Sequence, residues 1–154
     1  MQIINSEREA REESLLQTLT EIWESSVRAT HHFLSASDVE KLRPQVQEAL
    51  KQIPVLLVCL KPNSEANQPI GFLGVEGRKV EMLFIDGSAR GSGAGSLLMH
   101  KAFELTHANE VDVNEQNPQA IGFYEHLGFC IFARSETDSE ERPFPLLHMR
   151  REQS

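Results

Sequence analysis

The spacing of hydrophobic positions changes along the chain and divides it into a helical part and a strand-rich part. Between residues 15 and 27, apolar side chains recur at steps of three and four, which is the spacing of one buried helix face. The same spacing recurs over residues 39–50, and Pro54 closes this second helical stretch. Ser6 and Ser37 each stand three residues before a glutamate, so we expect the two helices to start with capping boxes at these serines.

Short apolar runs with many β-branched residues follow and predict three strands, over residues 55–60, 70–75 and 79–86. The segments between them, 61–69 and 76–78, are rich in turn-forming residues, so an antiparallel meander is expected. The third strand is apolar at Val80 and at every position from Met82 to Ile85. This composition is typical of a strand that is buried on both faces.

The remaining elements alternate between helix and strand. A helix that buries one apolar face is expected after residue 93, then a strand over 111–114, a helix from Asn117 to Gly128, and strands over 129–133 and 144–150. The residues expected on the buried face of the first of these helices are Leu97, Leu98, Ala102 and Leu105. With a short strand ahead of the first helix, the order predicts an α+β fold, a mixed central sheet flanked by about four helices.

Composition narrows the class of protein. The 154 residues suit one domain spanning 1–154, and the net charge of -8 without a basic stripe argues against a nucleic acid partner. No window is apolar enough to cross a membrane and the first residues do not resemble a signal peptide, so no membrane partner and a cytoplasmic location are expected. Cys59 and Cys130 lie in apolar runs, which predicts buried, reduced thiols.

A glycine-rich segment joins the strand that ends near residue 86 to the following helix. The unpaired amides and positive dipole end of a helix bind phosphate, and glycines let the backbone come close to it. A P-loop would need a lysine after Gly95, where Ser96 stands, and the glycine spacing is wrong for a Rossmann fingerprint. Glycines that only allow a tight turn, or a nucleotide site of another class, remain the alternatives.

The strand, the segment Arg90-Gly91-Ser92-Gly93-Ala94-Gly95 and the helix after it resemble the acetyl-CoA motif of the GNAT N-acetyltransferase superfamily. A second block, over residues 114–129, resembles the family's pattern N-x-x-N-x-x-A-x-x-F-Y-x-x-x-G-F. The order of elements matches the GNAT fold across the chain, and residues 29–34 are similar to a bacterial subgroup of small acetyltransferases. Gly87 departs from the family, in which proline is common at this position.

The resemblance implies that the cofactor acetyl-CoA is held mainly by main-chain atoms of the strand and loop. The residues concerned are Leu83, Phe84, Ile85, Arg90, Gly91, Ser92, Gly93, Ala94, Gly95 and Ser96. An amide near Leu83 would also polarise the acetyl carbonyl. The side chains of Asn114 and Asn117 are expected to reach the cofactor, although a helix cap is the alternative for Asn117.

The resemblance also implies a mechanism in which Tyr124 protonates the departing thiolate of coenzyme A. For the base we select Glu81, because strand alternation would place it on the same face as Leu83 and Ile85, although a solvated carboxylate at the end of the strand is the alternative. Glu76 and His148 are further candidates for the base.

The expected substrate is an amine acceptor, either a small molecule or a peptide, which reacts in a ternary complex without an acyl-enzyme. His31 and Phe33 are expected to line its pocket. No metal site is expected. The main alternative is a non-catalytic module that binds coenzyme A. The acceptor's identity, and the choice between a monomer and a homodimer, stay open.

Overall fold

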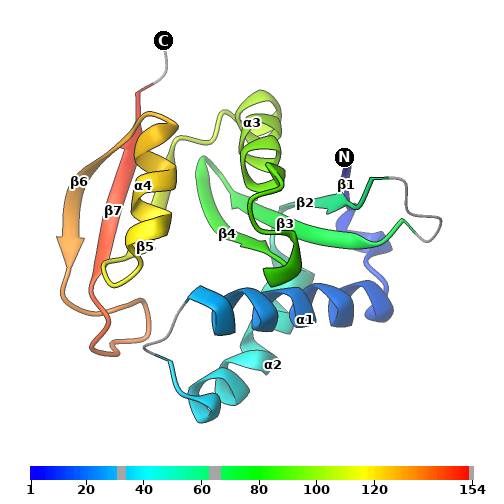
Figure 1. Cartoon of the computed structure of the whole chain (residues 1–154), viewed down its shortest axis with the longest axis horizontal. Coiled ribbons are helices and arrows are strands. Elements are labelled where there is room, and N and C mark those ends of the chain that lie inside the picture. The colour runs from blue at the N-terminus through cyan, green and yellow to red at the C-terminus, as the bar shows by residue number, and fades with distance from the viewer. Residues whose placement is uncertain (31–33, 63–66, 153–154) are drawn as a thin grey trace.

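The computed structural model describes residues 1–30, 34–62 and 67–152, and its elements alternate as the sequence predicts (Figure 1). The strands are β1 (Gln2–Asn5), β2 (Val55–Leu60), β3 (Pro69–Glu76), β4 (Lys79–Ile85), β5 (Glu110–Asn114), β6 (Phe129–Ser135) and β7 (Leu146–Arg151). The α-helices are α1 (Glu13–Thr30), α2 (Ala36–Gln52), α3 (Ala94–Thr106) and α4 (Pro118–His126). Two short 3-10 turns, η1 (Arg8–Ala10) and η2 (Gly87–Ala89), precede α1 and α3.

The strands form one mixed sheet in the order β1-β2-β3-β4-β5-β7-β6. Every neighbouring pair is antiparallel except β4 and β5, which run parallel. The predicted meander of β2, β3 and β4 and the predicted mixed sheet are therefore confirmed. The parallel pairing is short, because only Lys79 with Glu110 and Val80 with Val111 lie opposite each other. Beyond Val80, β4 has no partner strand on this side among the described residues.

A bulge in β4 shifts the register of the sheet next to this point. Val75 of β3 lies opposite Val80, but Gly74 lies opposite Met82, so Glu81 has no partner in β3. An unpaired extra residue of this kind interrupts the alternation of faces along the strand.

The two faces of the sheet bury separate hydrophobic clusters. One lies under α3 and α4 and includes Leu73, Leu98, Val111 and Tyr124. The other joins α1 and α2 to the opposite face of β2, β3 and β4 and includes Trp23. No residue of β5, β6 or β7 in the described part of the chain belongs to this second cluster. On that side, neither hydrophobic cluster covers the β5–β7 half of the sheet.

Both predicted helix starts are wrong, the first by several residues and the second by about one half-turn of helix. The amide of Ser6 donates to the carbonyl of Leu56 in continuation of β1, and α1 begins only at Glu13, after η1. The capping box of α2 uses Ser35, whose hydroxyl accepts from the amide of Asp38 at 3.1 Å while the Asp38 carboxylate accepts from the amide of Ser35. Two overlapping capping signatures stand here in the sequence, and the earlier one is used.

Several predicted burials also need correction. Cys59 is buried, but Cys130 is exposed because β6 is an edge strand of the sheet. Leu97 and Leu105 are exposed, and Met99 takes their place on the buried face of α3. The strand over 79–85 is only half-buried in its second half. No helix among the described residues is long and apolar enough to cross a membrane.

Candidate functional site

The loop between β4 and α3 is shaped by local hydrogen bonds and by two glycines. The Asp86 carboxylate accepts from the amide and the hydroxyl of Ser88, which closes η2. Gly91 and Gly93 have φ angles of 80° and 89°, in the left-handed region that residues with a Cβ avoid. Gly93 is the N-cap of α3, and no acidic residue stands in the first turn of that helix.

This conformation leaves a row of main-chain donors at the start of α3. The amides of Gly91, Gly93, Gly95 and Ser96 have no hydrogen-bond partner among the described residues. The positive end of the α3 dipole lies at the same place, so the loop favours an anionic ligand such as a phosphate group.

A cavity of about 390 Å³ lies beside the loop, between β4, α3, α4 and the end of α1. All the predicted cofactor residues line it except Asn114: Leu83, Phe84, Ile85, Arg90, Gly91, Ser92, Gly93, Ala94, Gly95, Ser96, Asn117 and Tyr124. The half-buried apolar side chains of β4 therefore face an open space as well as the core, which is why this strand is not buried on both faces.

Tyr124 lies on α4 and packs among aromatic rings at the inner end of the site. Its ring centroid is 5.1 Å from that of Phe123 and 5.6 Å from that of Phe129. Burial raises the pKa of the Tyr124 phenol well above its ordinary value, because the phenolate would lose its hydration. The group is therefore a neutral phenol at physiological pH, able to donate a proton.

The two asparagines of the second sequence motif occupy different positions. Asn117 caps α4 by accepting from the amide of Ala120 at 3.2 Å, and it also lines the cavity. Asn114 accepts from the amide of Gln116 at 2.8 Å and does not line the cavity. The carboxamide of Asn114 therefore stabilises the turn before α4.

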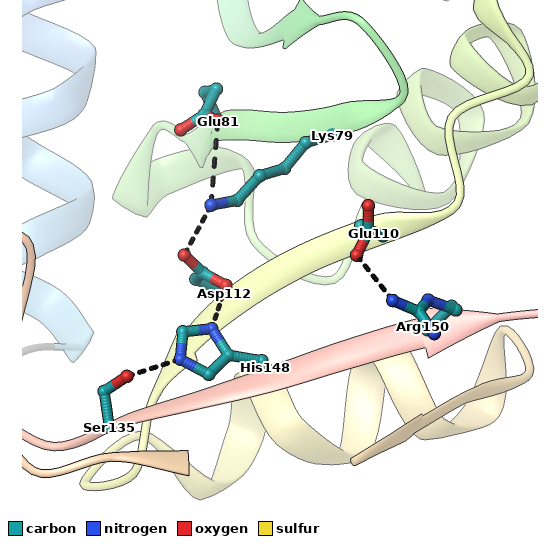
Figure 2. A network of polar contacts seen from close by, with 7 residues as sticks. All are labelled: Lys79, Glu81, Glu110, Asp112, Ser135, His148 and Arg150. Atoms are coloured by element: carbon teal, nitrogen blue, oxygen red, sulfur yellow. Dashed lines mark hydrogen bonds and ion pairs between the residues drawn. The ribbon is translucent and has the colours of Figure 1, made fainter. Parts of the chain in front are cut away.

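The structure corrects the predicted orientation of Glu81. Because of the bulge, Val80 packs with Leu83 in the cluster under α3 and α4, and Glu81 does not line the cavity. Its carboxylate instead lies 3.8 Å from the Lys79 ammonium (Figure 2). Simple alternation along an unbroken strand was the assumption that failed.

Figure 2 shows the polar cluster that Glu81 joins, on the face of the sheet away from α4. Lys79 donates to Asp112 at 2.6 Å, and the other oxygen of Asp112 lies 2.6 Å from Nδ1 of His148. The Ser135 hydroxyl is 2.7 Å from Nε2 of the same imidazole. Burial raises the pKa of Glu81, and the Asp112 and Glu76 carboxylates add to this effect while Lys79 opposes it.

A family model described as an acetyltransferase (GNAT) domain matches residues 24–153 of this chain. The chain belongs to the GNAT acetyltransferase family. Peptidyl-lysine N-acetyltransferase YjaB of Escherichia coli (strain K12) is 38% identical to it over 147 residues, which cover 96% of each protein. The chain is thus an N-acetyltransferase that moves an acetyl group from acetyl-CoA to an amine.

Solved structures agree with this assignment. The solution structure of apo-form YjaB from Escherichia coli matches this GNAT acetyltransferase with a TM-score of 0.82 and 37% identity, covering 100% of both chains. The PaiA N-acetyltransferase of Thermoplasma acidophilum, solved in complex with coenzyme A, matches with a TM-score of 0.68 and 20% identity. That match covers 97% of this chain and 99% of the other, and it concerns the fold.

The residues of the acetyltransferase site fit acetyl-CoA on two observations. The unpaired amides at the start of α3 suit a pyrophosphate. In the part of the chain that the structure describes, the edge of β4 beyond Val80 has no strand partner, so its main-chain groups are available to the amides of a pantetheine arm.

Five residues of this site are not evident from the glycine loop. Ser26 and Thr30 bring α1 to the cavity, and Gln119, Ala120 and Phe123 bring α4 to it. The Gln119 carboxamide accepts from Arg90 across the loop. Ala120 and Phe123 had a visible signal, since both belong to the second sequence motif.

The Gly87 position has a structural explanation. Its amide donates to the Ser25 hydroxyl of α1 at 3.1 Å, a bond that a proline could not make.

The predicted acceptor residues His31 and Phe33 lie outside the described residues. Within the described part of the chain, no three His, Cys, Asp or Glu side chains are grouped to hold a metal ion.

Proposed function

We propose that this acetyltransferase modifies the ε-amine of lysine side chains in proteins or peptides, by direct attack of the amine on the thioester. The relative that shares 38% of its sequence bears the name of a peptidyl-lysine N-acetyltransferase. The observation that carries the proposal is the polar cluster beside the point where β4 and β5 cease to pair. A long, unbranched amine approaching from the side that neither hydrophobic cluster covers would meet the Glu81 carboxylate before it reached the cavity.

The proposed roles of the chain's residues follow from their positions. The amides at the start of α3, with Arg90, hold the pyrophosphate, and the β4 edge orients the arm. Acetyl-CoA supplies the thioester carbon that the amine attacks. The main-chain amide near Leu83 would stabilise the negative charge that develops on the carbonyl oxygen.

Two side chains move protons in this proposal. Glu81 accepts one proton from the acceptor ammonium, and the neutral amine then attacks the carbonyl carbon. As the carbon–sulfur bond breaks, Tyr124 gives its phenolic proton to the sulfur. The second proton on the nitrogen is released as the amide forms and replaces the one that Tyr124 lost, so one proton leaves through Glu81 to solvent.

We also propose a cytoplasmic location. Cys59 and Cys130 are free thiols, and a reducing compartment would keep them so.

The test is a panel of acceptors presented to the purified protein with acetyl-CoA, measured by thiol release and by mass spectrometry of the product. The panel holds peptides with a lysine and a blocked N-terminus, peptides with a free N-terminus and no lysine, and small polyamines. We expect acetylation of the lysine peptides, and a fall of about tenfold or more in kcat/KM for Glu81→Gln. Acetylation confined to the N-terminal amines or polyamines would contradict the lysine proposal. Full activity in Glu81→Gln would contradict the assignment of the base.

A further inference from the structure

The polar cluster contains one ammonium group between two carboxylates at unequal distances. Nζ of Lys79 lies 2.6 Å from Oδ2 of Asp112 but 3.8 Å from Oε1 of Glu81 (Figure 2). The first distance is that of a strong charge-assisted hydrogen bond, and the second is that of a loose ion pair. The two carboxylates are therefore not equivalent, although they belong to neighbouring strands.

Asp112 is fixed in place by more than Lys79. Its second oxygen is 2.6 Å from Nδ1 of His148, which lies directly opposite it on β7, and Nε2 of that imidazole is held by Ser135. Although burial acts to raise it, the pKa of Asp112 is lowered by its bonds with Lys79 and His148. This carboxylate is an ionised anchor, with both oxygens engaged.

Among the residues that the structure describes, the other charged groups around Glu81 do not supply it with a close partner. Glu76, on β3, adds negative charge, and Glu110, on β5, is paired with Arg150 at 3.2 Å. On α1, which packs against β4, Glu24 is matched by two arginines of the helical layer, Arg28 and Arg43. Within the described part of the chain, Lys79 is thus the cation that could neutralise Glu81, and Asp112 holds it.

We propose that Asp112 is a positioning residue for Glu81: it draws the Lys79 ammonium toward β5 and so leaves the Glu81 carboxylate without a close counter-ion, facing the acceptor amine. His148 and Ser135 serve this arrangement by fixing Asp112. The inference rests on the proposed function, in which Glu81 accepts the proton of the acceptor. The inference identifies Asp112 as the residue that keeps the Glu81 carboxylate basic enough to accept this proton.

The experiment is a double-mutant cycle with Asp112→Asn and Lys79→Met. The readouts are the pKa of Glu81, followed by carbon NMR of its carboxyl group, and the acidic limb of the pH profile of kcat/KM. With Asp112→Asn, Lys79 turns to Glu81, so the pKa and the limb move to lower pH by about 0.5 or more. With Lys79→Met, both move to higher pH, and activity on the acidic side of the limb falls about tenfold for each pH unit that the limb moves.

The double variant separates positioning from the charge of Asp112 itself. If Asp112 acts through Lys79, then Asp112→Asn has little effect on Glu81 in the Lys79→Met background. An equal change in the pKa of Glu81 in both backgrounds would overturn the inference, and so would a pKa of Glu81 that fails to rise in Lys79→Met alone.

Glu81→Gln distinguishes this failure from failure of the proposed function. If that variant keeps full activity, Glu81 is not the base, whatever the cycle shows. If it loses activity while the cycle shows no coupling, the base is correct and the role of Asp112 is not.

Discussion

The two faces of the sheet offer different kinds of groups to a ligand. On the face under α3 and α4, the available groups belong mainly to the backbone: amides at the start of α3 and the unpaired edge of β4. On the other face, in the part of the sheet that α1 and α2 do not cover, the available groups are charged side chains from several strands. The first arrangement needs glycines at a few positions, whereas the second needs a register between strands.

The difference is consistent with the proposed roles of the two faces, one binding an unvarying ligand and the other a variable one. Main-chain amides are present whatever the side chains, so a site built from them is preserved as long as the loop keeps its conformation. A cluster such as Lys79, Asp112 and His148 changes its charge with one substitution. We therefore expect substitutions on the polar face to change the use of the acceptor and not the binding of the acetyl donor.

The largest effect is expected from Tyr124→Phe on the cavity face. Loss of the phenol should lower kcat about a hundredfold, because the thiolate would depart without a proton donor. The binding of acetyl-CoA, followed by its shift of the thermal unfolding midpoint, should change little, since the aromatic ring remains. A variant with kcat within about twofold of the wild type would remove Tyr124 from the mechanism.

A smaller effect on the same face is expected from Gly93→Ala. The φ angle of 89° disfavours a residue with a Cβ by about 1–2 kcal/mol, so the loop should relax and acetyl-CoA should bind about tenfold more weakly. Isothermal titration calorimetry measures this change. Gly122→Ala is the matched control, because Gly122 lies in α4, its φ is not positive and an added Cβ meets nothing within 4 Å. Equal affinities in the two variants would mean that the loop conformation does not matter for binding.

The smallest effects, but of opposite sign, are expected for the stability of the two carboxylate variants on the polar face. The pKa of Asp112 is lowered in the folded protein, so its contribution is present above the unfolded-state pKa and is lost as the pH falls through the lowered value. The pKa of Glu81 is raised, so the ionised group costs stability at neutral pH, and that cost disappears as the pH falls.

Urea unfolding at several pH values measures the contributions of Asp112 and Glu81 to the free energy of unfolding. At neutral pH, Asp112→Asn should lower the free energy of unfolding and Glu81→Gln should raise it slightly, and both differences should shrink in acid. A destabilised Glu81→Gln at neutral pH would show that Glu81 supports the fold, which is the opposite of what its loose pairing predicts.

Prediction from sequence succeeded where the information is local. The order of elements, the Asn117 cap and the glycine loop depend on residues a few positions apart, and the lining of the cavity matches the expected set with the exception of Asn114. It failed for the face of β4 on which Glu81 lies, because a bulge between Gly74 and Val75 shifted that face, and for Cys130, because nothing in its apolar run indicated an edge strand.

The sequence alone determined the family, the glycine loop at the start of α3 and the single tyrosine that lines the cavity, because short motifs encode turns, caps and helix starts through local physics. The tertiary structure alone decided the polar cluster. Asp112 and His148 stand 36 positions apart, and they meet only because β7 returns to lie antiparallel to β5. A contact of this range is set by strand register, which the burial of a whole sheet face fixes and which no neighbouring residues reveal.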